Sequence, residues 1–210
     1  MSKTGLNIFF RHEERYRMKT VCVFCGSRDG VRPSYKAMAK LMGSTLARRR
    51  LGLVYGGGRV GLMGALADAA LTEGGEVIGI IPKALVEKEV AHTGLSKLYV
   101  VGSMHERKKL MADLSDGFVA LPGGYGTLEE FLEVLSWAQL SIHEKPCGLL
   151  DVDGFWKPLS SLFDKAVAEG FVRPDHRSLV LTEEDPELLL DKMDRYTPSK
   201  TKKWIGPQDL

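Results

Sequence analysis

The stretch LGLVYGGGRVGLMGALADAALTEGGEVIGIIP, residues 51–82, decides the fold. It begins with a short apolar run over residues 51–55 and continues through three glycines into a helical pattern over residues 60–73. It then ends in a second apolar run over residues 76–81. A strand, a helix and a second strand joined by short connections are typical of a βαβ unit, whose two strands are parallel. The stretch therefore predicts a parallel sheet.

The same unit repeats along the rest of the chain. We predict an α/β fold with one domain over residues 19–196, a Rossmann-like doubly wound parallel sheet of about seven strands with helices on both faces. Residues 1–18 are expected to form a flexible leader and residues 197–210 a loosely ordered tail. The further strands are expected at residues 19–25, 98–101, 117–121, 147–152 and 178–181, and the further helices at residues 33–50, 103–115, 127–142, 155–169 and 186–196.

The composition excludes several classes of protein. The chain has 210 residues, with 29 Lys+Arg against 27 Asp+Glu and a formal net charge of +2. Because the basic residues are scattered, the sequence offers no basic stripe for nucleic acid. No apolar run is long enough to span a membrane, and residues 1–17 lack an apolar signal core, so we expect a cytoplasmic protein without a membrane partner.

The cysteines and histidines do not indicate a redox, metal or cofactor site. Three cysteines cannot form a disulfide framework, and Cys22 and Cys25 lie on a predicted strand, where their side chains point to opposite faces. The five histidines lack the spacing of metal ligands, and no G-x-S-x-G motif accompanies a catalytic triad. We therefore expect neither a metal ion nor a cofactor.

Ligands of a doubly wound sheet bind at the carboxyl ends of the strands. This chain places glycine-rich loops at three of those ends, over residues 25–27, 55–61 and 121–127. Glycines let backbone N–H groups approach an anion closely, and a helix that follows such a loop adds its positive end. The three loops are therefore the candidate binding site for an anionic small molecule.

The second of these loops has two interpretations. It matches G-x-G-x-x-G at Gly56, Gly58 and Gly61. The next strand, however, ends in Pro82 and Lys83 instead of the acidic residue that binds the ribose of a dinucleotide, which argues against NAD. A nucleotide-binding loop and a tight turn needed only for strand–helix packing both remain open.

The third loop is more informative. Gly123, Gly124 and Gly126 precede Thr127, which we expect to be the N-cap of the helix over residues 127–142. The loop then resembles a cradle for a monophosphate, with Glu129 and Glu130 in the first helical turn. Residues 127–130 also fit the capping box T-x-x-E, in which Glu130 has only a structural role.

The helix over residues 103–115 breaks its own hydrophobic pattern. Arg107 falls near the centre of its apolar face, with Lys108 at the edge of that face. A buried guanidinium needs a partner, which is either a structural carboxylate such as Asp116 or an anion bound in the site. In the helix over residues 127–142, Trp137 is expected opposite the apolar face and indicates a subunit contact, together with Leu140 and Ile142.

Two motifs in combination indicate a family. Residues 122–130, PGGYGTLEE, match P-G-G-x-G-T-x-x-E, and Met104-His-Glu-Arg107-Lys108 precedes them at the spacing of that family. With residues 55–58 and 61–64, the chain resembles the LONELY GUY (LOG) family of cytokinin riboside 5′-monophosphate phosphoribohydrolases over residues 19–196. Many relatives carry an older label, lysine decarboxylase, but the sequence has no apparatus for pyridoxal phosphate.

The resemblance implies hydrolysis of the N-glycosidic bond in an adenosine 5′-monophosphate whose amine carries an isoprenoid, with release of the free base and ribose 5-phosphate. It implies Arg107 and Glu130 as catalytic residues, and a homodimer with sites near the subunit interface. The substrate-binding positions that it implies are Ser27, Gly57, Gly58, Met63, Met104, Lys108, Gly123, Gly124, Gly126 and Thr127.

The residues themselves agree with a glycosidase. A ribosyl–nitrogen bond breaks through an oxocarbenium-like state, so a carboxylate near the sugar can stabilise the cation, orient water or act as nucleophile. Two alternatives stay open. One is a general nucleosidase acting on AMP or other nucleotides, and the other is a carrier of a nucleotide-like cofactor such as molybdenum cofactor. A carrier does not need the pair Arg107 and Glu130, which favours the enzyme.

Overall fold

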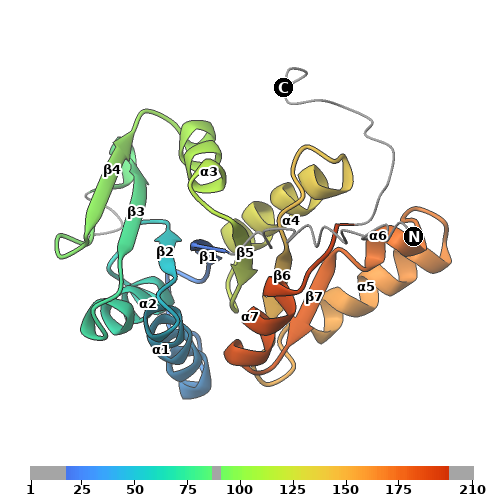
Figure 1. Ribbon diagram of the computed structural model, residues 1–210, viewed down its shortest axis with the longest axis horizontal. Helices are drawn as coiled ribbons and strands as arrows, with labels where there is room; N and C mark the ends of the chain where they lie inside the picture. Colours follow the sequence, from blue (N-terminus) through green and yellow to red (C-terminus); the bar gives the residue numbers. More distant parts are fainter. Residues whose placement is uncertain (1–17, 87–90, 199–210) are drawn as a thin grey trace, which may run out of the picture.

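Seven strands form one parallel sheet in the computed structural model, which describes residues 18–86 and 91–198. The expected leader, except Met18, and the tail beyond residue 198 lie outside these ranges. The strand order is β4-β3-β2-β1-β5-β6-β7 (Figure 1), and each neighbouring pair is parallel. The strands are β1 (Thr20–Phe24), β2 (Gly52–Tyr55), β3 (Val77–Pro82), β4 (Lys97–Val101), β5 (Gly117–Ala120), β6 (Cys147–Leu150) and β7 (Val180–Glu183).

Helices cover both faces of the sheet, as expected for a doubly wound fold. One face packs against α1 (Pro33–Arg48), α2 (Gly61–Thr72) and α7 (Pro186–Asp194). The other packs against α3 (Met104–Asp113), α4 (Tyr125–Gln139) and α5 (Lys157–Ala168). Each face therefore has its own hydrophobic core, and the α/β prediction is confirmed.

The strand side chains explain why both faces must be covered. All residues of β2, β3, β5 and β6 are buried, because a central parallel strand packs against helices on both sides. Cys22 of β1 lies in the core beside α4, and Cys25, directly after β1, lies in the core beside α1 and α2. The prediction that these two thiols point to opposite faces is confirmed.

Two details differ from the sequence-based expectation. A four-residue helix, α6 (Pro174–Arg177), precedes β7 and was not predicted. Trp137 is half-buried and packs against the core beside α4, together with neighbouring side chains of that helix, so placing it opposite the apolar face was wrong. The broad indole reaches the core from a position that the helical pattern assigns to the flank.

The described residues include no helix that is both long and apolar enough to cross a membrane. Met18, at the edge of the expected leader, is buried at 3% exposure in the core beside α1 and α2.

Candidate active site

The three glycine-rich loops meet at the carboxyl edge of the sheet, where the strand order reverses between β1 and β5. The N–H of Gly26 donates to the carbonyl of Pro122 at 3.1 Å, which links the loops after β1 and β5. The N–H of Leu62 donates to the carbonyl of Gly26 at 3.0 Å, which adds the start of α2. The sequence analysis predicted a ligand site at this edge, and the three loops do converge there.

A cavity of about 470 Å³ opens between the loops that follow β1 and β5. Of the predicted substrate-binding residues, Ser27, Gly123 and Gly124 line it. Tyr35 and Phe155 form an apolar wall that the sequence analysis did not identify, with ring centroids 5.9 Å apart in an edge-to-face arrangement. The cavity thus combines backbone amides at one side with aromatic surface at the other.

The start of α4 corrects the sequence analysis. The N-cap is Gly124, in an extended conformation, and the helix begins at Tyr125, two residues earlier than expected. Thr127 is therefore the third helical residue and not the N-cap. Its side chain is buried against Gly123, where an added Cβ would lie 2.0 Å from Thr127 Oγ1. The two glycines hid this start, because neither carries a capping side chain.

This earlier start also removes the capping-box interpretation of Glu130. A capping box needs the threonine at the N-cap and the glutamate at the third helical position. Glu130 is the sixth residue of α4, so neither it nor Glu129 lies in the first turn, which contains no acidic residue. The first turn thus presents backbone amides without a carboxylate, an arrangement suited to an anion.

Arg107 is the centre of the buried charge in the site. Arg107 is 6% exposed. Its Nε donates to the carbonyl of Ile80 at 3.2 Å, and its Nη2 donates to the carbonyl of Gly56 at 3.3 Å. Its Nη1 lies 3.7 Å from Glu130 Oε1, whose side chain is 11% exposed. The carboxylate beside Arg107 is thus Glu130, whereas Asp116 accepts hydrogen bonds from the backbone N–H groups of Lys19 and Thr20.

Gly56 is required by this arrangement. A Cβ at this position would lie 2.1 Å from Arg107 Nη2 and 3.3 Å from Met63 Sδ. Any larger residue therefore displaces either the guanidinium or the loop. The second glycine loop accordingly does more than turn the chain, because its first carbonyl holds a charged side chain.

Lys108 does not lie open to the cavity. Its Nζ is 2.5 Å from Glu129 Oε1 and 2.9 Å from Glu133 Oε1, which joins α3 to α4. Burial alone would lower the pKa of Lys108, but the hydrogen bonds to the two glutamates raise it above its ordinary value. The structure therefore pairs Lys108 with Glu129 and Glu133, which links α3 to α4. Its contact with substrate stays a prediction.

The remaining predicted residues surround Arg107 or continue the loops. Met63 is buried, while Met104 is 41% exposed with its Sδ 3.8 Å from Arg107 Nη1. Gly57 adopts a left-handed φ of 77°, and Gly58 pairs with Ala91 in an antiparallel bridge. Around Gly124 and Gly126, an added Cβ would meet open space.

The buried cysteines are poor nucleophiles. Burial raises the pKa of Cys22 well above its ordinary value, and the charge of Glu130 raises it further. Burial and Glu130 also raise the pKa of Cys25. Since the thiolate is the reactive form, neither side chain supplies covalent chemistry at neutral pH. The groups that can act are the guanidinium, the carboxylate and the backbone amides.

Two parts of the site had no signal in the sequence. The carbonyl oxygens of Ile80 and Gly56 that hold Arg107 are backbone groups. Every residue has such a carbonyl, so the sequence does not indicate which ones bind a side chain. Ala91 and His92 hold the second glycine loop from a segment to which the sequence analysis assigned neither an element nor a role. Both depend on how distant segments pack.

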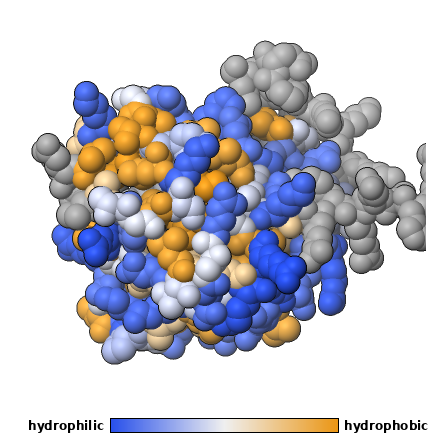
Figure 2. All heavy atoms as spheres, turned by 60° about the vertical axis from the view of Figure 1, so that its left-hand side comes forward, coloured by the Kyte–Doolittle hydropathy of each residue, from blue (hydrophilic) through white to orange (hydrophobic). Residues whose placement is uncertain are grey.

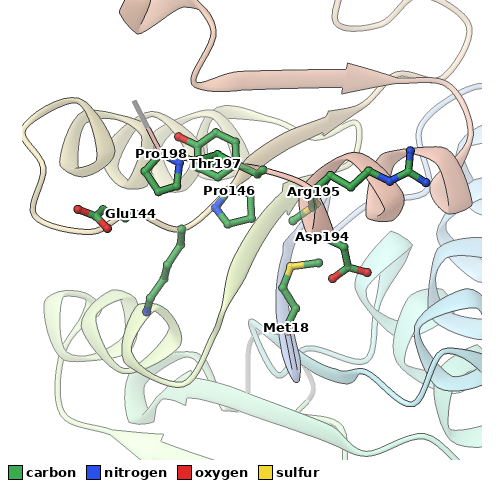
Figure 3. Close-up of a pocket in the computed structure, with 10 residues that line it drawn as sticks. Met18, Glu144, Pro146, Asp194, Arg195, Thr197 and Pro198 are labelled. Atoms are coloured by element: carbon green, nitrogen blue, oxygen red, sulfur yellow. The ribbon is translucent and has the colours of Figure 1, made fainter. Parts of the chain in front are cut away.

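A second cavity, also of about 470 Å³, lies at the opposite edge of the sheet (Figure 3). Met18 precedes β1 and Pro146 precedes β6, so this cavity is at the amino ends of the strands. Parallel sheets of this kind bind ligands at the carboxyl ends. We therefore place the candidate active site at the glycine loops.

Comparison with known proteins agrees with this architecture. The family model described as possible lysine decarboxylase matches residues 63–193. The probable cytokinin riboside 5′-monophosphate phosphoribohydrolase LOGL9 of Oryza sativa subsp. japonica is 53% identical over 187 residues, covering 89% of this chain and 82% of that protein. The cytokinin riboside 5′-monophosphate phosphoribohydrolase LOG7 of Arabidopsis thaliana is 47% identical over 186 residues, covering 89% and 86%.

Solved structures share the fold at lower identity. The molybdenum cofactor binding protein from Rippkaea orientalis has a TM-score of 0.64 at 23% identity, covering 86% of this chain and 98% of that one. The molybdenum cofactor carrier protein from Chlamydomonas reinhardtii has a TM-score of 0.66 at 22% identity, covering 85% and 98%. At this identity, the two structures show only that the fold is shared. The sequence relatives, at about 50% identity, show the family of this chain. The chain belongs to the LONELY GUY (LOG) family.

Proposed function

We propose that this chain hydrolyses the N-glycosidic bond of adenine-type nucleoside 5′-monophosphates, cytokinin riboside 5′-monophosphates among them, to the free base and ribose 5-phosphate. The observation that carries the proposal is the buried pair of Arg107 and Glu130 beside two glycine loops at the carboxyl edge of the sheet. The activity named for relatives about 50% identical supports it.

The first turn of α4 is the proposed site of the 5′-phosphate. The backbone N–H groups at Tyr125, Gly126 and Thr127 have no partner within the helix, and the helix dipole favours an anion at this end. Gly123 and Gly124 let the phosphate approach the backbone, and Ser27 faces it across the cavity. The first turn of α4 adds no carboxylate that would repel the phosphate, and Asp29, which also lines the cavity, pairs with Lys36 Nζ at 3.0 Å.

Glu130, one and a half turns into the same helix, is the proposed partner of the ribose. As the C1′–N bond breaks, its electron pair passes to the base nitrogen and positive charge builds on the sugar. The carboxylate stabilises this charge. Water adds its oxygen to C1′, and the proton that it loses neutralises the departing base. The balance of atoms needs no cofactor.

Arg107 is the proposed partner of the departing base or of the substrate's oxygens. Its guanidinium is held by two neutral carbonyl oxygens, so it is fixed in place before substrate arrives. Fixed charge that requires no reorganisation is the most effective means of stabilising a transition state. Met104, exposed beside it, offers an adaptable apolar surface for an alkyl group on the base.

A homodimer is part of the proposal. Figure 2 shows apolar side chains gathered on the side of the molecule that β4 and α3 form, where Val100 is 54% and Met104 is 41% exposed. Exposed apolar surface of this kind marks an interface between subunits. Sedimentation of the full chain at micromolar concentration tests it, and a single species at 23.2 kDa would contradict it.

The activity is tested by chromatography of free base released from three compounds: isopentenyladenosine 5′-monophosphate, AMP and isopentenyladenosine. We expect release from the monophosphates and not from the riboside, and loss of release with Arg107→Ala. The ratio between the two nucleotides separates a cytokinin-activating enzyme from a general nucleosidase. No release from any of them, with nucleotide binding retained, would leave the carrier function.

A further inference from the structure

The second glycine loop, residues 55–61, pairs with two residues of a later segment, Ala91 and His92. His92 donates its backbone N–H to the carbonyl of Gly57 at 3.0 Å, and Ala91 pairs with Gly58. Gly57 is in the left-handed region, so the loop has the freedom of a glycine backbone and no side chain of its own to fix it. Its path therefore depends on the segment around His92.

The imidazole of His92 in turn fixes that segment. His92 is 5% exposed, its Nδ1 accepts the N–H of Gly94 at 3.1 Å, and its Nε2 lies 2.9 Å from Asp68 Oδ1. Because Nδ1 accepts, the proton of the neutral ring is on Nε2 and is donated to Asp68. Asp68 belongs to α2, the helix that begins directly after the same glycine loop.

These contacts form a continuous path to the chemistry. Asp68 orients the imidazole, the backbone of His92 holds Gly57, and the preceding carbonyl of Gly56 accepts from Arg107 at 3.3 Å. Arg107 then faces Glu130. A shift of the loop by a fraction of an ångström moves one of the two carbonyl oxygens that fix the guanidinium.

We propose that His92, oriented by Asp68, is a positioning residue that holds the Gly56–Gly58 backbone so that Arg107 stays opposite Glu130. This inference rests on the proposed function, because its kinetic effect requires a hydrolytic reaction. It assigns a role in the reaction to two side chains that do not touch the substrate. Neither belongs to the motifs that identify the family.

The experiment compares Asp68→Ala, His92→Asn and His92→Gln in the full-length protein. The matched control is Glu73→Ala, which removes an exposed carboxylate from the end of the same helix. Misplacing a catalytic group by about 1 Å costs on the order of a hundredfold in rate, so we expect the smaller displacement in Asp68→Ala to lower kcat about tenfold. KM should change less than about twofold, because the phosphate cavity is lined by other loops.

The two histidine variants separate the effect of the hydrogen bond to Asp68 from the effect of removing the imidazole ring. Glutamine places its amide N–H near the position of Nε2 and can still donate to Asp68, whereas asparagine is too short. We expect His92→Gln to keep most of kcat and His92→Asn to fall at least as far as Asp68→Ala. Equal losses in both, accompanied by equal falls in Tm, would show that His92 only stabilises the fold and would overturn the proposal.

A spectroscopic measurement keeps the inference separate from the proposed activity. The Nε–H of Arg107 donates to Ile80, so its NMR resonance reports whether the guanidinium is immobilised; Arg107→Lys assigns it. Asp68→Ala should speed exchange of this proton, while Glu73→Ala should not. If the wild-type chain hydrolyses no nucleotide, the proposed function fails, and this resonance still decides the positioning role. Unchanged exchange in Asp68→Ala would overturn it.

Discussion

Arg107 and Lys108 are neighbours on α3, yet the regions around them are built differently. Lys108 meets two carboxylates of α4 at 2.5 and 2.9 Å, so its charge is closely matched within the protein. Arg107 is held by two neutral carbonyls, and its Nη1 lies 3.7 Å from Glu130 Oε1, longer than a direct hydrogen bond. The first region ties two helices together, and the second is the one that the proposed function assigns to the substrate.

The largest expected effect is from Glu130→Gln, which removes the negative charge from the second region and keeps the side-chain shape. Stabilisation of a developing cation disappears, so we expect kcat to fall about a thousandfold. Nucleotide affinity should fall little, since the proposed phosphate site is the first turn of α4 and does not include Glu130.

Single-turnover release of base and calorimetric binding of AMP measure the two quantities. Glu129→Gln is the matched control, because it removes the neighbouring charge from the first region. Equal turnover in both variants would show that Glu130 has no part in the chemistry.

The next effect is from Gly56→Ala, which acts on Arg107 through the backbone. The added Cβ would lie 2.1 Å from Arg107 Nη2, so the guanidinium must leave its place. We expect kcat to fall about a hundredfold. Gly102→Ala, whose Cβ would approach only Oε2 of the exposed Glu106 side chain at 3.3 Å, is the control and should keep full activity.

Steady-state kinetics and thermal melting of the two glycine variants decide the outcome. If Gly56→Ala loses activity only in proportion to its loss of folded protein, then the carbonyl of this glycine does not position Arg107.

The contrast also shows what a sequence can reveal of a site. The period of the apolar residues predicted the seven strands and their helices, and the position of Arg107 on an apolar face predicted a buried guanidinium, which the structure has. The catalytic role of Arg107 stays a prediction. The partners of Arg107 and Lys108 could not be predicted, since they depend on how α3 packs against α4, against β3 and against the loop after β2. The start of α4 was misplaced because Gly124 caps by its backbone conformation alone.

A smaller effect, on stability more than on rate, is expected from Lys108→Met in the first region. Methionine keeps the apolar stem but leaves Glu129 and Glu133 facing each other without the ammonium. We expect the free energy of unfolding to fall by about 2 kcal/mol, the scale of hydrogen bonds to charged groups. The rate with nucleotide should fall less than about tenfold.

Urea unfolding and turnover measure this contrast, with Lys109→Met as the control, because Lys109 is exposed and pairs with Asp113 one turn along the same helix. A loss of turnover as large as that of Glu130→Gln would mean that Lys108 contacts substrate and that the two regions are one.

The smallest effect concerns His143, near the far end of α4 from the phosphate cavity. Burial lowers its pKa from 6.5 to about 4, and its Nε2 lies 2.8 Å from the carbonyl of Val134 while its Nδ1 accepts the N–H of Lys145. His143 therefore binds a proton more tightly in the unfolded chain than in the folded protein. The stability contributed by neutral His143 is fully present above about pH 6.5 and is lost as the pH falls toward 4.

Between pH 6 and pH 5 this one group should cost about 1 kcal/mol of unfolding free energy, since each pKa unit corresponds to roughly 1.4 kcal/mol. His143→Gln can still donate to Val134 but does not titrate, so its stability should fall by about 1 kcal/mol less over this range. His105→Gln, at an exposed position of α3, should behave like the wild type. Urea unfolding at the two pH values measures the difference. An identical loss of unfolding free energy between the two pH values in all three proteins would place the acid sensitivity elsewhere, whereas the expected result assigns part of it to His143 beyond the end of α4.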